Sequence, residues 1–587
     1  MDRVKNMVNW LRTGFRLDFL LLGLLLLTVF PYSARLNNPN ERTRVLQSWA
    51  IVEHGQLHIG ETERDRRGRI VFKDIHGNRS RRPFVNDIAL VCADPTKEPP
   101  RCIGKIYPAK PPGVTLLGLP ALWIARAVKF IEDSPIGEPG VTPRQMQDAR
   151  RKWQKIVEAK ATWILRYGGV VVPLLLTLLA FVALLRRAGI SHQVTRFSVW
   201  TTVLGTSLLP YSLAFVGHAL AGSALLAAFV LLIRAEEFSR PRLVSYAGGL
   251  LAGWAVLLEY QAVAPLLALC VWVVVTRKGR RTFIGFAAGS ASALAIFAWI
   301  HNAMFNSPMK TGHFYLTTAH NREGQSSGFL GVDGLHSGSL VDHLFDPYMG
   351  LAPLMPWLFL GFVVGLWAVF RLKEETFSKA ERGVLIAMPL LSLLFVCTLG
   401  NWRVMNGWSI GPRYLLTAIV PMAAVSSLGW AWLMDRHKVC VPLCCGLALA
   451  SVAIIVTMTI TYPSPTNAIL SPFGEMSLPM LSDGIGVRNI FMDFGTTTGS
   501  TSIWTVAALF GLAGLHAVWM LLKGRAFRTV AWMASAALGL AIFFLSQLEA
   551  HHPTDPKVRD RKVKGAIKSV EGVGEGTGQN TFFPGYD

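Results

Sequence analysis

Long apolar stretches separated by short charged segments recur along most of this chain. A bilayer core about 30 Å thick is crossed by about 20 apolar helical residues, and about 13 stretches come near that length. The predicted spans cover residues 19–34, 163–185, 197–215, 219–233, 243–258, 262–276, 283–304, 351–370, 384–399, 414–434, 439–460, 503–522 and 530–548. Because Glu259 and Tyr260 interrupt it, the stretch 243–276 is either two tight spans or one long tilted helix. The pattern predicts an all-α polytopic membrane protein.

The positions of Lys and Arg predict how the spans are oriented. Positively charged short loops stay on the cytoplasmic side, and basic residues occur before the first span and then at every second junction, for example at 186–187, 277–281 and 371–382. The N-terminus is therefore expected inside. The long connections 35–162, 305–350, 400–413 and 461–502 and the tail after residue 548 are expected outside, in the periplasm or exterior, and candidate chemistry belongs there.

These elements predict a simple domain organisation. Residues 1–34 form the cytoplasmic N-terminus and first span, 35–162 the outer loop, 163–460 the main bundle, and 461–548 an outer loop with the last two spans. The outer loop is expected to carry amphipathic helices, among them a capped helix after Pro39 and a half-buried helix over 113–131. The tail 549–587 is rich in Gly, Lys and Glu, which predicts disorder.

Composition sharpens this picture. The chain has 58 Lys and Arg against 36 Asp and Glu, a net charge of +22, yet only 16% of its residues are charged and 51% are hydrophobic. Such a chain is not a soluble nucleic-acid binder. Half of the positive charge is explained by topology, but the outer loop also carries many basic residues, including Arg64, Arg66, Arg67 and Arg69. They are either a solvated face or a surface that receives phosphate or anionic lipid.

The cysteine and histidine patterns predict one disulfide bond and no metal site. Cys92 and Cys102 flank a short Pro-containing segment of the outer loop, where a disulfide persists in an oxidising compartment, so we predict a disulfide between them. The other five cysteines lie in apolar spans. His313 and three further histidines lie in the loop 305–350, but their irregular spacing favours an ordinary mobile loop, placed as a lid, over a metal site. No metal or cofactor is predicted.

The order of several motifs resembles a known superfamily. After the first span come Pro39-Asn40-Glu41-Arg42, then Glu53-His54-Gly55, then Tyr107-Pro108-Ala109-Lys110-Pro111-Pro112-Gly113. Later stretches are Phe345-Asp346-Pro347-Tyr348-Met349-Gly350 and Asn401-Trp402 through Gly411-Pro412-Arg413-Tyr414. This order resembles the GT-C superfamily of integral membrane glycosyltransferases, in particular bacterial relatives of protein O-mannosyltransferases and of the lipid A aminoarabinose transferase. The resemblance covers residues 15 to 435 and implies a GT-C-like bundle.

The resemblance implies an enzyme that moves a sugar from a polyprenyl-phosphate carrier to an acceptor hydroxyl, with inversion, at the outer face of a bacterial cytoplasmic (inner) membrane. The acceptor is a lipid, a glycan or a protein. Such a transfer needs a carboxylate that accepts the acceptor proton and cations that stabilise the leaving phosphate. We predict Glu41 as the base, with Asp87 as its distant acidic partner, and Lys110 and Arg413 as the phosphate-binding cations.

Further residues are candidates for substrate binding. Tyr107 and Tyr414 are either sugar or phosphate ligands or ordinary interfacial tyrosines. His218, at an outer helix end, either lines the same cavity or packs as a buried histidine. Glu259 is a candidate because a carboxylate within the membrane usually faces a polar cavity.

Two other classes of function remain open. A transporter or flippase for a lipid-linked glycan would also use many spans and basic residues, but it would place paired ionisable groups near the middle of the bilayer. A catalytically inactive relative that scaffolds an envelope complex would keep the fold without the chemistry.

Overall fold

The computed structural model describes residues 15–29, 38–85, 87–131, 143–276, 279–318, 322–323, 332, 334–399, 409–466, 468–487, 489–493, 499–523, 528–548 and 555–571. The structural statements that follow concern these residues. The basic N-terminal residues Arg3, Lys5 and Arg12, the residue Asn86 and the motif from Asn401 to Trp408 lie outside the described residues.

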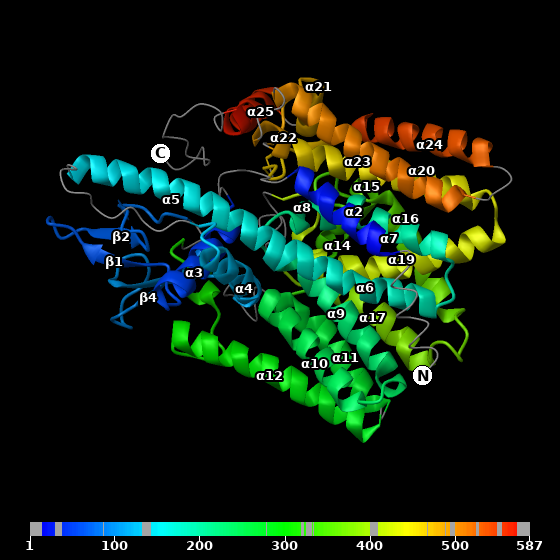
Figure 1. Cartoon of the computed structure of the whole chain (residues 1–587), viewed down its shortest axis with the longest axis horizontal. Coiled ribbons are helices and arrows are strands. Elements are labelled where there is room, and N and C mark those ends of the chain that lie inside the picture. Colours follow the sequence, from blue (N-terminus) through cyan, green and yellow to red (C-terminus); the bar gives the residue numbers. More distant parts are fainter. Residues whose placement is uncertain are drawn as a thin grey trace.

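Helices form most of the described chain (Figure 1). The first half contains α2 (Phe15–Thr28), α3 (Pro39–His54), α4 (Gly113–Ala127), α5 (Pro143–Arg166), α6 (Val172–Arg187), α7 (His192–Leu204), α8 (Leu208–Ser212), α9 (His218–Arg234), α10 (Pro241–Leu258), α11 (Val263–Val275) and α12 (Arg280–Phe305). The second half contains α14 (Ser337–Phe345), α15 (Leu351–Leu354), α16 (Pro356–Phe370), α17 (Lys379–Cys397), α19 (Leu416–Arg436), α20 (Cys440–Thr461), α21 (Leu478–Ser482), α22 (Ile490–Asp493), α23 (Gly499–Leu522), α24 (Arg528–Leu548) and α25 (Pro556–Glu571).

Within the described residues, eight helical stretches are long and apolar enough to cross a membrane. They are Ile156–Arg187, His218–Glu237, Pro241–Leu258, Arg280–Phe305, Lys379–Cys397, Arg413–Arg436, Cys440–Thr461 and Ser500–Leu522. Four shorter apolar helical stretches accompany them, at Leu17–Thr28, Gly113–Ala127, Tyr260–Val275 and Pro356–Phe370. The chain is an integral membrane protein, and the number of about 13 spans stays a prediction.

Small residues let neighbouring helices of the bundle pack closely. Helices α10 and α12 lie side by side, as Figure 1 shows. A Cβ atom added at Gly249 of α10 would lie 2.1 Å from the carbonyl oxygen of Phe286 in α12, which is closer than any real contact. Backbones that approach this closely are typical of membrane helices, where small residues mark the interface.

The helix ends that carry the predicted cytoplasmic charges meet at one end of the bundle. Arg187, at the end of α6, pairs with Glu237 just after α9, and its Nε donates to the carbonyl oxygen of Thr376, 3.1 Å away. Arg382 of α17 donates to the carbonyl oxygen of Phe370, the last residue of α16, at 2.8 Å. These ends were predicted to share one side, and they do. Which side of a membrane they face stays a prediction.

The outer loop contains a β-sheet, which the sequence analysis did not predict. Five antiparallel strands, β1 (Gly60–Arg64), β2 (Ile70–Asp74), β3 (Arg79–Ser80), β4 (Ile88–Cys92) and β5 (Gly104–Pro108), pair in the order β3-β2-β1-β5-β4. The prediction for this loop named amphipathic helices and a small subdomain, but no strands. The strands are at most five residues long, and β1 to β3 carry several charged residues, so the two-residue alternation is brief and is easily missed.

Asp side chains close the two turns that join β1 to β3. Asp65 Oδ1 accepts hydrogen bonds from the backbone of Arg67 and Arg69, each at 2.9 Å. Asp74 Oδ1 accepts likewise from His76 at 3.0 Å and from Asn78 at 2.8 Å. This is the Asx-turn chemistry that favours tight reversals. The sheet lies beyond one end of the helical bundle, beside α3 and α5 (Figure 1).

Two uncertain segments have definite structures. The stretch 243–276 consists of two helices, since α10 ends at Leu258 and α11 begins at Val263 after the short helix η3 (Tyr260–Ala262), with extended backbone at Glu259 between them. Part of the tail that was expected to be disordered forms helix α25, whose Val563, Ala566 and Ile567 pack against a small apolar cluster near α21.

Candidate functional site

The pairing of β4 with β5 places Asp87 beside Lys110. Ile88 is opposite Pro108 in this antiparallel pair, and the next backbone bond runs from the Ala109 N–H to the Asp87 carbonyl oxygen, at 3.1 Å. Lys110 Nζ lies 3.9 Å from Asp87 Oδ1. The Asp87 side chain is 21% exposed and that of Lys110 9%. The strand register therefore brings a partly accessible carboxylate and an ammonium group to one end of the sheet.

The predicted disulfide lies at the opposite end of the same strand pair. Cys92 and Cys102 are bonded, with their Cα atoms 5.6 Å apart, and Cys92 is opposite Gly104 in the register. The bond therefore ties the far ends of β4 and β5 together, and holds the register that places Asp87 and Lys110.

Helix α3 begins where the sequence predicts a capped helix. The Asn38 side chain accepts a hydrogen bond from the Asn40 N–H at 3.0 Å, and Pro39 occupies the first turn. Glu41 follows in that turn, with only 2% of its surface exposed. The cap thus sets the direction in which Glu41 and the next turn of the helix project.

Glu41 is fully engaged by structural partners. Its Oε1 lies 2.6 Å from Arg166 Nε, and its Oε2 2.7 Å from Arg166 Nη2. Oε1 also accepts the Phe215 N–H at 2.7 Å. Such a bidentate, buried pair links α3 to the end of α5 and to the segment before α9. The geometry does not favour the predicted role of general base, because both oxygens already bind groups of the protein.

Arg44, one turn after Glu41, reaches a different carboxylate. Its Nη2 lies 3.1 Å from Glu259 Oε1, with the two side chains 0% and 5% exposed, and it also donates to Asn40 Oδ1. Glu259 stands at the break between α10 and α11. The sequence analysis grouped Arg44 with the other basic residues of the outer loop. Its spacing of three residues from Glu41, on the same side of a helix, was the available signal.

His218 and Arg413 complete this group. His218 Nδ1 lies 3.3 Å from Glu259 Oε1. Arg44, Lys110 and Arg413 are all close enough to Glu259 to interact with its charge, and Asp87 interacts in the same way with Arg413. We call the set Arg44, Asp87, Lys110, His218, Glu259 and Arg413 the polar cluster. It holds three permanent cations and two carboxylates, so it has an excess of positive charge.

Tyr414 borders the polar cluster. The Arg413 guanidinium lies 5.3 Å from the centre of the Tyr414 ring, and the rings of Tyr414 and His218 are 6.3 Å apart. Tyr107, by contrast, points into an apolar group: its ring lies 5.9 Å from that of Phe305 and 6.3 Å from that of His58. The structure therefore brings five of the predicted binding residues together and leaves Tyr107 outside.

His313 is a neighbour of the polar cluster that the sequence analysis assigned to a mobile loop. Gly312 packs so tightly on the next strand end that a Cβ atom added there would lie 2.5 Å from Ala109 Cα. His313 is buried, and its charge would interact with that of Lys110. The loop is anchored here by backbone contact, which no pattern in its sequence predicts.

Several buried polar groups in this region have no hydrogen-bond partner within the described part of the chain. They include both ring nitrogens of His218 and both ring nitrogens of His313. An unsatisfied buried group costs about 1–3 kcal/mol. Within the same described residues, no three His, Cys, Asp or Glu side chains form a group that could hold a metal ion.

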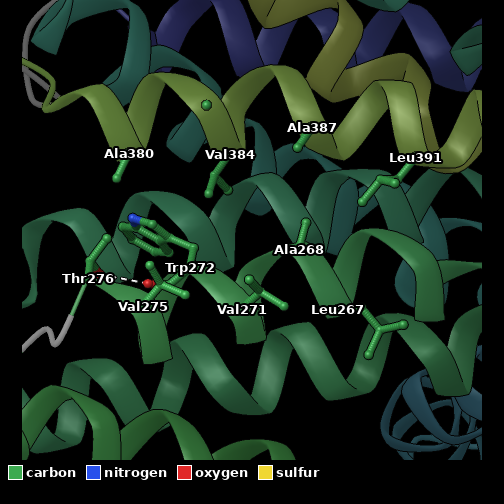
Figure 2. A pocket seen from close by; sticks show the side chains of 11 residues that line it. Leu267, Ala268, Val271, Trp272, Val275, Thr276, Ala380, Val384, Ala387 and Leu391 are labelled. Atoms are coloured by element: carbon green, nitrogen blue, oxygen red, sulfur yellow. Dashed lines mark hydrogen bonds between the residues drawn. The ribbon is translucent and has the colours of Figure 1, made fainter.

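An apolar groove runs between α11 and α17. Figure 2 shows Trp272 and Val271 of α11 facing Ala380, Val384 and Ala387 of α17 across it. The short helix η3 alone separates the start of α11 from Glu259, and α17 contacts the short helix η5 (Arg413–Leu415). The groove is therefore bordered by two helices that both reach the polar cluster.

No protein-family model matches this sequence, and no curated protein does. Solved structures similar to this chain include ArnT from Cupriavidus metallidurans bound to undecaprenyl phosphate, at 14% identity and a TM-score of 0.42, over 89% of this chain and 79% of that one. The apo form of the same protein matches at 13% identity, a TM-score of 0.42, and 89% and 78% coverage.

The archaeal oligosaccharyltransferase AglB from Archaeoglobus fulgidus, in complex with an inhibitory peptide and a dolichol-phosphate, is also similar. It matches at 12% identity and a TM-score of 0.43, over 90% of this chain and 56% of its own. Because all three TM-scores are below 0.5, the likeness by itself establishes neither the fold nor the function of this chain.

Proposed function

We propose that this chain is an integral membrane glycosyltransferase. It moves a sugar from a polyprenyl-phosphate carrier to an acceptor hydroxyl, with inversion at the anomeric carbon. The acceptor is a lipid, a glycan or a protein.

The observation that carries the proposal is the meeting of Arg44, Lys110 and Arg413 around two carboxylates at one end of the bundle. An excess of buried positive charge is unfavourable unless an anion balances it. Lys and Arg both recognise phosphate, and Arg does so with two parallel hydrogen bonds. A lipid phosphate entering from the membrane would meet all three cations at this position.

Asp87 is the carboxylate best placed to act as the base. It is more exposed than Glu259, lies 3.9 Å from Lys110 Nζ, and interacts with Arg44 and Arg413. In a single displacement, the acceptor oxygen forms a bond to the anomeric carbon while the bond from that carbon to the phosphate oxygen breaks. Asp87 takes the acceptor proton, and Lys110 and Arg413 hold the charge of the departing polyprenyl phosphate. Glu41 then has a positioning role.

The apolar groove between α11 and α17 is the proposed place for the polyprenyl chain (Figure 2). Its walls are aliphatic and aromatic, and both flanking helices lead to the polar cluster. A lipid whose phosphate binds Lys110 and Arg413 would therefore find an apolar surface for its chain.

We place this reaction at the outer face of a bacterial inner membrane. The polar cluster lies at the end of the bundle that carries the sheet and its disulfide, and disulfides persist in the periplasm and other oxidising compartments. The opposite end carries the arginines that the positive-inside rule assigns to the cytoplasm.

The test is release of polyprenyl phosphate by the full-length protein in nanodiscs, measured with a panel of radiolabelled polyprenyl-phosphate hexoses and pentoses. We expect turnover of at least one donor by the wild type, and loss of that turnover in Lys110→Ala. Lys438→Ala, at the far end of α19, is the matched control and should turn over like the wild type. If no donor is turned over, the transferase proposal fails, and lipid transport or a scaffold role becomes the better explanation.

A further inference from the structure

Two buried histidines lie beside the phosphate-binding cations. Within the described residues, His218 has one close polar neighbour, Glu259 Oε1 at 3.3 Å from Nδ1, and His313 has none. His218 begins α9 and His313 lies in the loop that packs on Ala109. Both are near enough to Lys110 to interact with its charge. All four of their ring nitrogens lack a hydrogen-bond partner within the described residues. Groups of this kind are normally paired when buried, so their position indicates a ligand.

The surroundings of the two rings define what that ligand is. Burial lowers the pKa of His313 well below its usual range, and nearby Lys110 acts in the same direction. A neutral imidazole donates from one nitrogen and accepts at the other. A phosphate or carboxylate only accepts, whereas a hydroxyl group both donates and accepts. The neutral imidazole of His313 near Lys110, and the His218 ring near all three cations, therefore suit an uncharged, hydroxyl-rich group attached to a phosphate.

The packing behind His313 is rigid and leaves its nitrogens available. Its ring meets the Tyr260 ring at 86°, with the centres 5.7 Å apart. Tyr260 is itself held, because its hydroxyl lies 2.9 Å from His301 Nε2, while His301 Nδ1 lies 3.0 Å from the Phe297 carbonyl oxygen. A carbonyl only accepts, so Nδ1 carries the proton and Tyr260 donates to Nε2. The hydroxyl proton of Tyr260 is thus committed to His301.

Two further buried groups flank the histidines in sequence. Gln261 Nε2, two residues after Glu259, and Thr311 Oγ1, two residues before His313, also lack partners within the described residues. Both are uncharged and able to bind hydroxyl groups. The unsatisfied groups next to the two histidines are thus uncharged and suit hydroxyl groups, whereas the nearby cations suit the phosphate.

We propose that His218 and His313 form the subsite for the sugar ring of the lipid-phosphate donor. This inference rests on the proposed function and deepens it. The sugar is joined directly to the phosphate, so its hydroxyl groups must lie close to Lys110, whose charge acts on both imidazoles. The histidines recognise the sugar and the cations recognise the phosphate.

The test compares two kinds of probe on the full-length protein in nanodiscs: undecaprenyl phosphate, and undecaprenyl-phosphate mannose, glucose and arabinose. We expect His313→Ala and His218→Ala each to weaken the tightest sugar-bearing probe about tenfold or more, the loss of about one good hydrogen bond. The same variants should change the affinity for undecaprenyl phosphate less than about twofold. His313→Gln, which keeps a donor and an acceptor, should recover part of the affinity. The exposed His437→Ala is the matched control, and melting temperatures verify folding.

Three outcomes would overturn the subsite: an equal loss for both kinds of probe, no loss for either, or a wild type that binds no sugar-bearing probe more tightly than undecaprenyl phosphate. Lys110→Ala separates this from failure of the proposed function. If Lys110→Ala leaves the affinity for undecaprenyl phosphate unchanged, the proposed position of the phosphate site is wrong, whatever affinities the histidine variants show.

Discussion

Helix α3 carries two buried charged residues, Glu41 and Arg44, whose side chains contact two different sets of partners. Glu41 is held by Arg166 and the Phe215 N–H, and all of its partners belong to the protein. Arg44 reaches Glu259, in a region where several polar groups are left without partners. An ion pair whose two members satisfy each other stabilises the packing of helices. A cluster with more cations than carboxylates can instead bind an anion. The comparison indicates that burial and charge alone do not distinguish the two kinds of site, whereas the number of partners that each charged group has does.

The largest expected effect is a loss of donor turnover caused by a substitution in the polar cluster. Asp87→Asn should lower donor turnover by about 10²–10⁴-fold, the usual contribution of a general base. Some stability should be lost as well, because Lys110, whose side chain is 9% exposed, loses its carboxylate neighbour, so turnover is compared per folded molecule. Turnover of the labelled donor and the melting temperature in nanodiscs measure the two quantities. An Asp87→Asn variant that turns over like the wild type would remove Asp87 from the mechanism.

Substitutions in the ion pair of Glu41 with Arg166 should have the opposite effect, since they should lower stability more than turnover. Arg166→Met leaves Glu41 buried without its cation and should cost about 3–5 kcal/mol of stability. Glu41→Gln should lose less, because an amide still accepts the Phe215 N–H. Thermal unfolding and the yield of folded protein measure this loss. The double variant Glu41→Leu with Arg166→Met should recover much of the lost stability, since neither charge of this pair then remains buried without its partner.

Glu41→Gln also decides between the two carboxylates. Turnover per folded molecule should stay near that of the wild type. If folded Glu41→Gln is inactive while Asp87→Asn is active, the general base is Glu41, as the sequence motif predicts, and its pairing with Arg166 must open during the reaction.

A smaller effect is expected at the disulfide. Replacing Cys92 and Cys102 together with serine removes a cross-link that closes a short loop, which should cost about 2–3 kcal/mol. Because the bond holds the register of β4 and β5, turnover should fall with it as Asp87 and Lys110 become less well aligned. The melting temperature of the protein and donor turnover should therefore decline together. If neither changes, the disulfide is not needed to hold the register of β4 and β5.

The smallest effect is expected at Tyr107. Its ring packs against Phe305 and away from the polar cluster, so Tyr107→Phe should change donor turnover less than about twofold. Tyr414→Phe is the matched comparison, because the Tyr414 ring borders both Arg413 and His218. A large loss in Tyr107→Phe would show that this hydroxyl reaches the substrate.

Much of the architecture follows from local pattern. Apolar length and the alternation of basic residues predicted where the described spans lie and which of their ends meet, as Arg187 and Arg382 show. A break at Glu259 was one of two possibilities that the sequence left open, and the structure shows the break. The β-sheet was missed, since its strands are short and the β1–β5 pair that joins its two halves brings together residues that are distant along the chain. Strand pairing depends on such partners, which a local pattern does not contain.

The sequence by itself determined that this is a membrane protein, which residues are the candidate cations, and that Cys92 can pair with Cys102. Hydropathy and charge act residue by residue, so the order of the chain is sufficient for these conclusions. Only the tertiary structure decided which charges meet: Glu41 with Arg166, Arg44 with Glu259, and Lys110 with Asp87. Each of the first two pairs joins residues more than a hundred positions apart, and the third depends on a strand register. Whether a buried carboxylate is a structural partner or a base is set by those distant neighbours, because they decide which of its oxygens remain free.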